Sequence, residues 1–169
     1  RGLFRSVNAL SANPTFTKLT VNTANGGDRS IPDATFEPGN PNNVLCTVLG
    51  FNGTGDGGIY RSTNALDPTP ASVTFTRTLT LGTATATQRC DLAINKVGST
   101  VTVIAATAES TTGRVRRSTD GGATWSATLG GGSNGFCGSQ CVYDNEPGIH
   151  PNDANIVLLG GATIFLRST

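Results

Sequence analysis

The sequence predicts an all-β fold built from one unit of short strands that the chain uses several times. Serines preceded by an arginine recur 56 positions apart at Ser6, Ser62 and Ser118, and Ser168 follows 50 positions later. A repeat of this length means that one small structural unit recurs along the chain. Short runs of β-branched and apolar residues, bounded by Gly, Pro and Asn, lie between these serines. No stretch keeps the 3.6-residue apolar period of a helix, so we expect almost no α-helix.

Each complete unit is expected to contain four antiparallel strands. The first unit supplies only its last two strands, at 3–6 and 16–21. The second supplies all four, at 31–37, 43–50, 57–63 and 73–81, and the third does so at 89–96, 100–108, 113–119 and 124–129. The last supplies three, at 142–149, 155–161 and 164–168. The repeats therefore span about 1–22, 29–82, 88–130 and 141–169 of a single domain, 1–169.

Four-stranded sheets that recur every ~40 to 60 residues are typical of the blades of a β-propeller. A β-solenoid is the structural alternative, but its turns are shorter. The expected strands amount to about three blades, which is a partial propeller with open sheet edges. We therefore expect further polypeptide, or another copy of this chain, to complete the propeller.

Composition narrows the classes of partner. The 169 residues carry a net charge of +1, and the basic residues are scattered along the chain. This pattern favours neither nucleic acid nor an anionic membrane surface as a partner. No apolar run approaches the roughly 20 residues that a membrane-spanning helix needs.

The four cysteines favour an extracellular, disulfide-bonded protein. Cys137 and Cys141 enclose a flexible three-residue spacer and are expected to bridge locally, which leaves Cys46 and Cys90 for each other. A zinc site is the alternative for the close pair. It is disfavoured because His150 is the only histidine of the chain.

One segment connects the repeat to a known superfamily. Residues 118–125, Ser-Thr-Asp-Gly-Gly-Ala-Thr-Trp, closely resemble the Asp box, S-x-D-x-G-x-T-W, which is the repeat of bacterial-neuraminidase-type (BNR) propellers. That superfamily includes sialidases, xyloglucanase-like glycosidases, sortilin-type receptors and photosystem assembly factors. In the first two copies Asn8 and Asn64 replace the aspartate, while Phe16 and Phe75 replace the tryptophan.

The box residues are expected to lock the hairpin between the third and fourth strands of a blade rather than to catalyse. Asp120 can accept hydrogen bonds from turn amides, and an asparagine keeps the same acceptor oxygen. Gly122 supplies backbone freedom, and Trp125 can fold its ring against the hairpin. The residues assigned to this structural role are Ser118, Asp120, Gly122, Trp125, Ser62, Asn64, Ser6 and Asn8.

A candidate site comes from the first strands, which line the central channel of a propeller. Aligning Phe36, Ile94 and Ile149 places an acidic residue three positions earlier in each unit. These residues are Asp33, Asp91 and Glu146. Asp144 lies two positions before Glu146, so in a strand it would point to the same face. Such carboxylates suit general acid/base work on a glycosidic bond, or collection of calcium. We favour the plainer interpretation, in which they are solvated channel residues or turn anchors.

Three functions remain open. The first is a secreted binding or scaffold module that holds a glycan or protein ligand. The second is part of a glycoside hydrolase, of sialidase or xyloglucanase type, that uses the inner-strand carboxylates. The third is a structural component of an extracellular assembly. Arg29, Arg89 and Tyr143 lie near the same strand starts, but Ser30 interrupts the Arg-Ile-Pro motif of sialidases, and no complete catalytic set is visible. We expect no cofactor, with a structural Ca²⁺ as the alternative.

Overall fold

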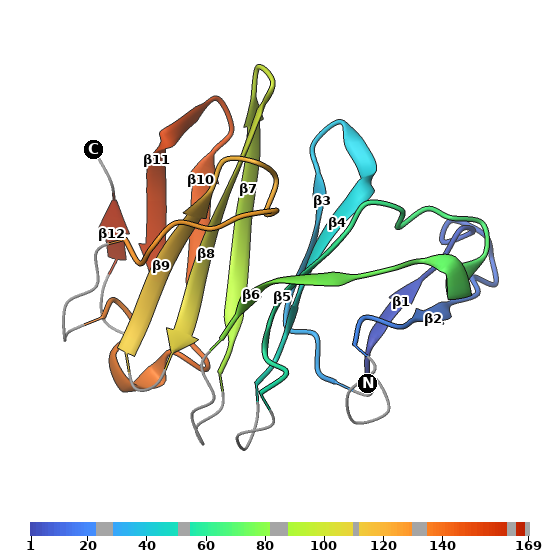
Figure 1. Ribbon diagram of the computed structural model, residues 1–169, viewed down its shortest axis with the longest axis horizontal. Helices are drawn as coiled ribbons and strands as arrows, with labels where there is room; N and C mark the ends of the chain where they lie inside the picture. The colour runs from blue at the N-terminus through green and yellow to red at the C-terminus, as the bar shows by residue number, and fades with distance from the viewer. Residues whose placement is uncertain are drawn as a thin grey trace.

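The protein is an all-β structure of several small antiparallel sheets (Figure 1). The computed structural model describes residues 1–22, 29–50, 55–81, 88–109, 112–129, 135–161 and 165–167. Within these ranges there is no α-helix, and two short 3₁₀ turns, η2 (Pro70–Ser72) and η3 (Gly138–Gln140), lie in connections. The described residues hold no helix long and apolar enough to cross a membrane.

The described strands form four sheets in chain order, and within each sheet every strand pairs with the next one along the chain. The first sheet is β1 (Leu3–Arg5) and β2 (Thr17–Leu19). The second is β3 (Ala34–Glu37), β4 (Asn40–Val48), β5 (Gly58–Ser62) and β6 (Thr76–Thr80). The third is β7 (Cys90–Val97), β8 (Thr100–Glu109) and β9 (Thr112–Ser118). The fourth is β10 (Glu146–His150), β11 (Asp153–Gly160) and β12 (Phe165–Arg167).

The sequence repeat is also a repeat of strand register. The arginine before each box serine lies opposite an aliphatic residue of the preceding strand. The pairs are Leu45 with Arg61, Ile104 with Arg117, and Leu158 with Arg167. Because side chains alternate between the two faces of a strand, this shared register sends equivalent residues to the same side of each sheet.

Apolar clusters fill the interfaces between consecutive sheets, which stand face to face in Figure 1. On β4, Cys46 and Val48 pack with Leu3 against the first sheet, whereas Leu45 packs with Val103 of the third sheet. The middle strands are therefore buried on both faces. Each fully buried aliphatic side chain stabilises the fold by about 1.5–3 kcal/mol relative to exposure. The protein thus has one core per pair of neighbouring sheets.

The expected strand Thr124–Leu129 is not a regular strand. Only Leu129 forms a bridge, with Val115 of β9. The amide of Arg117 donates to the Ser126 hydroxyl at 3.0 Å, so a side chain occupies the place of a ladder carbonyl. A serine at this position thus interrupts the pairing that the repeat predicted.

The strand expected at Val142–Ile149 begins later than predicted. The backbone amides of Tyr143 and Asp144 both donate to the carbonyl of Gln140, at 2.8 and 2.9 Å. These bonds fold the segment into a turn, and β10 begins at Glu146. Asp144 therefore precedes the strand, and the alternation that placed it on the same face as Glu146 does not apply.

Candidate functional site

The carboxylates predicted at the inner strands lie at equivalent places in three sheets. Phe36 pairs with Val44, which lies opposite the box serine Ser62. Ile94 pairs in the same way with Val103, opposite Ser118. Ile149 pairs with Val157, which occupies the corresponding place in the fourth sheet. Asp33, Asp91 and Glu146, three positions earlier, therefore share one level near the starts of β3, β7 and β10. β7 contacts both β3 and β10, so the structure brings these starts together.

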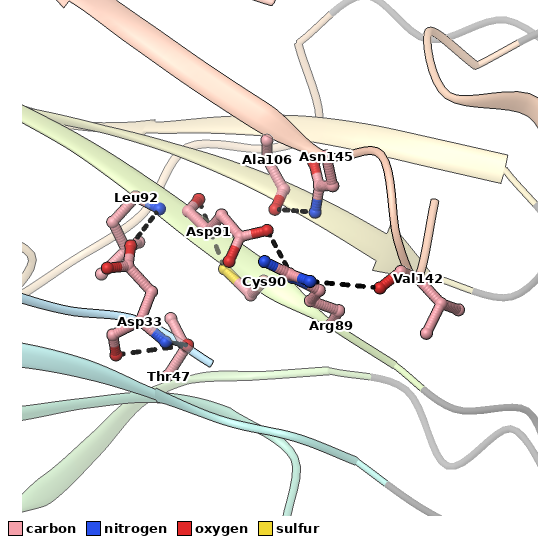
Figure 2. Close-up of polar contacts among 9 residues, drawn as sticks. All are labelled: Asp33, Thr47, Arg89, Cys90, Asp91, Leu92, Ala106, Val142 and Asn145. Atoms are coloured by element: carbon pink, nitrogen blue, oxygen red, sulfur yellow. Dashed lines mark hydrogen bonds and ion pairs between the residues drawn. The ribbon is translucent and has the colours of Figure 1, made fainter. Parts of the chain in front are cut away.

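Asp33 ties the second sheet to the third (Figure 2). Its carboxylate Oδ2 accepts the backbone amide of Leu92 at 2.7 Å. Its own backbone is held to β4, since its amide donates to the Thr47 hydroxyl at 3.1 Å and its carbonyl accepts the Thr47 amide at 2.9 Å. A carboxylate that accepts a backbone amide in this way completes the pairing of a partly buried donor.

Asp91 takes part in a contact between the start of β7 and the segment that precedes β10. It is 5% exposed, and its Oδ2 accepts Nε of Arg89 at 2.7 Å. The Arg89 Nη1 also donates to the carbonyl of Val142 at 3.4 Å (Figure 2). Burial raises the pKa of Asp91, and the carboxylates of Asp33 and Glu146 raise it further, while Arg89 lowers it.

Asn145 is a buried polar residue that sequence reasoning missed. It is 2% exposed, and its Nδ2 donates to the carbonyl of Ala106 in β8 at 2.7 Å (Figure 2). Its Oδ1 has no hydrogen-bond partner in the part of the chain that the structure describes. The neighbouring Asp144 and Glu146 are exposed, and Tyr143 is 76% exposed. No motif marks Asn145, because its role depends on the strand packed beside it.

The polar contacts at these strand starts hold neighbouring segments of the fold together. No three His, Cys, Asp or Glu side chains within the described ranges are grouped to hold a metal ion. Arg29, also noted near a strand start, forms an ion pair with Asp56. Of the candidate residues near these strand starts, Tyr143, Asp144 and Glu146 are the exposed ones within the described ranges.

The intact box, Ser118–Trp125, is a closed network of hydrogen bonds. The Ser118 hydroxyl donates to Asp120 Oδ1 at 2.7 Å and accepts the Gly122 amide at 2.9 Å. Thr124 donates its amide to Oδ1 at 2.9 Å and its hydroxyl to Oδ2 at 2.6 Å. Although burial raises the pKa of Asp120, the bonds from Thr124 and Ser118 lower it to about 2. The carboxylate is engaged in holding the turn.

In the two degenerate copies, the amide oxygen of an asparagine accepts the hydrogen bonds that Asp120 Oδ1 accepts in the intact box. In the first, Asn8 Oδ1 accepts the Ser6 hydroxyl at 3.0 Å and the Thr15 amide at 2.9 Å. In the second, Asn64 Oδ1 accepts the Ser62 hydroxyl at 3.2 Å, and the Thr74 amide donates to it at 3.0 Å. An acceptor oxygen is thus common to all three turns, whereas the negative charge is not.

Trp125 contacts the neighbouring sheet rather than only its own hairpin. Its indole N–H donates to the hydroxyl of Thr78 in β6 at 3.1 Å. Its ring packs on the cluster that contains Leu45 and Val103, and the equivalent Phe75 packs on the cluster of the preceding interface. Phe75 and Trp125 therefore fasten the second and third box hairpins to the sheets before them.

The four cysteines divide into one disulfide and two free thiols. Cys137 and Cys141 are joined and lie in the interface between the third and fourth sheets. Cys46 and Cys90 are free and buried, so the second expected disulfide is not formed. Cys46 faces the first interface and Cys90 packs in the second, which keeps their sulfur atoms apart. Burial, followed by the Asp33 carboxylate, raises the pKa of Cys46 to about 12, which keeps its thiol protonated.

Comparison with known proteins gave no match, whether with protein-family models, with curated protein sequences or with solved structures.

Proposed function

We propose that this chain is a secreted Asp-box β-propeller module that binds a glycan or protein ligand, or acts as a scaffold, without catalysing a reaction. The observation that carries the proposal is how Asp33 and Asp91 are bonded. Asp33 accepts an amide of the next sheet, and Asp91 is paired with Arg89, which itself contacts the segment that precedes β10. Groups held in this way position sheets and are poorly placed to exchange protons with a substrate.

The arrangement of the sheets supports the propeller. They follow one another in chain order, with β7 in contact with both β3 and β10 and apolar cores between neighbouring sheets. This is the relation expected of propeller blades around a channel lined by their first strands. We propose that further polypeptide or another copy of the chain completes it. The disulfide Cys137–Cys141 supports secretion, because disulfides persist in oxidising compartments.

The surface proposed to take the ligand lies at the start of β10. Tyr143 offers an exposed ring, and Asp144 and Glu146 offer exposed carboxylates. Arg89 reaches this segment through the carbonyl of Val142. An aromatic face beside a few polar groups is the combination that orients small polar ligands, sugars included.

Glycoside hydrolysis is the second candidate, and one observation favours it. The pKa of Asp91 is raised, as a glycosidase general acid requires, and the pKa effect of Glu146 on Asp91 indicates that a second carboxyl group is near. In this alternative Asp91 donates the proton to the leaving oxygen and Glu146 acts as base or nucleophile. A third candidate is a structural component of an extracellular assembly.

Binding and turnover measured on the same glycans separate these functions. We expect the protein to retain glycans or a protein ligand on an array while it releases no reducing sugar. Tyr143→Ala and Glu146→Gln should lower ligand affinity at least about 10-fold with unchanged thermal unfolding, because both side chains are exposed. Lys96→Ala is the matched control, an exposed residue at the other end of β7. Release of reducing sugar that is lost in Asp91→Asn would establish the hydrolase instead.

A further inference from the structure

The bond that Asp33 makes to the next sheet has no counterpart one sheet further along. Asp33 Oδ2 accepts the amide of Leu92 at 2.7 Å, and Asp91 holds the place of Asp33 in the third sheet. Leu92 lies two positions before the aligned isoleucine of β7, and Pro147 lies two positions before that of β10. A proline nitrogen carries no hydrogen, so Asp91 cannot repeat the bond that Asp33 makes.

Asp91 is bonded within its own segment instead. Its Oδ2 accepts Nε of Arg89, two positions earlier, at 2.7 Å, and Arg89 Nη1 donates to the Val142 carbonyl at 3.4 Å (Figure 2). Both Asp91, at 5% exposure, and Pro147 are buried. The carboxylate therefore lies in a covered position where the strand amide that its counterpart binds is missing.

Asn145 brings a second acceptor to the same place. Asp91 pairs with Ala106 in the register of β7 and β8, and Asn145 Nδ2 donates to the Ala106 carbonyl at 2.7 Å. Asn145 is 2% exposed, and its Oδ1 has no hydrogen-bond partner among the residues that the structure describes. An unpaired buried acceptor is unfavourable, so this oxygen requires a donor from outside those residues.

The charges around Asn145 are mostly negative. Asp144 and Glu146 flank it in the sequence and are exposed carboxylates, and Glu146 is near enough to raise the pKa of Asp91. Arg89 is already bonded to Asp91 and to the Val142 carbonyl. A group that fits here must bring hydrogen-bond donors, and the flanking carboxylates favour one that also carries positive charge.

We propose that Asp91 and Asn145 bind a protonated amine of the ligand, and that the glycan taken by this module carries an amino sugar with a free amine. An ammonium group is compact and has three donors, so it can reach acceptors that are almost wholly covered. A hydroxyl group would satisfy Asn145 but would leave the negative charge unbalanced. The inference rests on the proposed binding function and names the class of its ligand.

An amino sugar suits the position better than a lysine side chain does. The sugar ring holds its amine rigidly, whereas a lysine loses the freedom of a long flexible stem when its ammonium group is bound. Tyr143, two positions before Asn145, offers an aromatic face on which the sugar ring can lie.

Isothermal titration calorimetry of the full chain with two tetrasaccharides tests the amine site. One is a tetramer of glucosamine, and the other is the same tetramer fully N-acetylated, which keeps the sugar rings and removes the charge. We expect the free-amine form to bind at least about 10-fold more tightly, because charge-assisted hydrogen bonds are stronger than neutral ones. A tetralysine peptide, with the same ammonium group on flexible stems, should bind more weakly than the free-amine tetrasaccharide.

Pro147→Ala supplies the amide that the fourth sheet lacks. It offers Asp91 the partner that Leu92 offers Asp33, so affinity for the free-amine tetrasaccharide should fall about 10-fold while the unfolding midpoint is kept or raised. Pro41→Ala is the matched control, since Pro41 is an exposed proline of β4, and it should leave affinity unchanged.

A second pair of variants isolates the Asp91 charge. Asp91→Asn should weaken binding of the free-amine tetrasaccharide about 10-fold or more, with an oxygen still present to accept Arg89. Asp33→Asn changes the same repeat position of the second sheet, where the side chain is bonded to Leu92, and should leave affinity unchanged.

Four results would overturn the amine site. They are equal affinity for the two tetrasaccharides, binding of neither, equal effects of Asp91→Asn and Asp33→Asn, and a stably folded Pro147→Ala that binds as the wild type does. Each would mean that water alone meets the Asn145 oxygen. Tighter binding of tetralysine than of the free-amine tetrasaccharide would overturn the amino sugar in favour of a protein ligand. An array that retains other glycans in these cases leaves the proposed binding function intact, and only an array that retains no ligand contradicts it.

Discussion

The intact box at Ser118–Trp125 and its copy at Ser62–Thr74 hold the same turn with different chemistry. Asp120 accepts the Thr124 amide and hydroxyl with a charged carboxylate, while Asn64 accepts those of Thr74 with a neutral amide oxygen. The comparison teaches that the hairpin requires an acceptor at this position and tolerates the loss of charge. The charge instead makes the intact copy sensitive to acid.

The two copies differ more in how they meet the sheet before them. Gly122 has a positive φ of 81° and lies against Leu45, whereas the equivalent Leu66 is 49% exposed. Trp125 bonds to Thr78 of the preceding sheet. The intact box is thus packed into an interface, where the Leu45 side chain leaves no room for a Cβ at Gly122.

The largest effect on stability is expected from adding a methyl group at Gly122, where there is no room for one. Gly122→Ala should lower the free energy of unfolding by about 2–4 kcal/mol, from the positive φ and the overlap with Leu45. Leu66→Ala, at the same place in the second copy, should change it by less than about 0.5 kcal/mol. Urea denaturation of both variants measures the difference. Equal midpoints would mean that the two hairpins are packed alike.

A smaller effect is expected from removing the box aromatic. Trp125→Ala should cost about 2–3 kcal/mol, since the ring is half-buried and its N–H is paired with Thr78. Phe16→Ala should lower the free energy of unfolding by less than about 1 kcal/mol, because that ring is largely exposed. Far-UV circular dichroism is the readout, since the chain has one tryptophan. A Phe16→Ala cost as large as that of Trp125→Ala would contradict this ranking.

The smallest effect on stability is expected only at acidic pH. The pKa of Asp120 is about 2 in the folded protein against an ordinary value of 3.8, so its contribution to stability is present above pH 3.8 and is lost as the pH falls toward 2. Asp120→Asn should flatten the dependence of the unfolding midpoint on pH in this window. Asn64→Asp should steepen it if the second turn holds a carboxylate in the same way. An unchanged pH profile in Asp120→Asn would show that other carboxyl groups govern acid unfolding.

Most of the strand order followed from local patterns. β-branched runs between turn residues placed strands at β4, β5, β8 and β9, with ends within a few residues of those observed. The errors have identifiable causes. The Ser126 hydroxyl takes a ladder hydrogen bond, and the Gln140 carbonyl folds the segment before β10. Neither contact has a strong signature in hydropathy or in β propensity.

The candidate site was predictable in position but not in bonding. Alignment of the repeats placed Asp33, Asp91 and Glu146 at one level, because register follows from alternation along each strand. That Asp33 accepts the Leu92 amide, and that Asn145 is buried beside Ala106, depends on the distance between separate sheets. The missing disulfide has the same origin, since Cys46 and Cys90 pack in different interfaces.

The sequence by itself determined the repeat and the bonds within each box hairpin, because the partners in such a hairpin lie within about ten positions and fixed spacing brings them together. Only the tertiary structure decided which faces are covered, which carboxylates join neighbouring sheets, and which arginine meets which carbonyl. Arg61 and Gly121 are 60 positions apart, and Asp33 and Leu92 are 59 apart. Contacts of that span depend on how whole sheets pack, and no local pattern of residues encodes that packing.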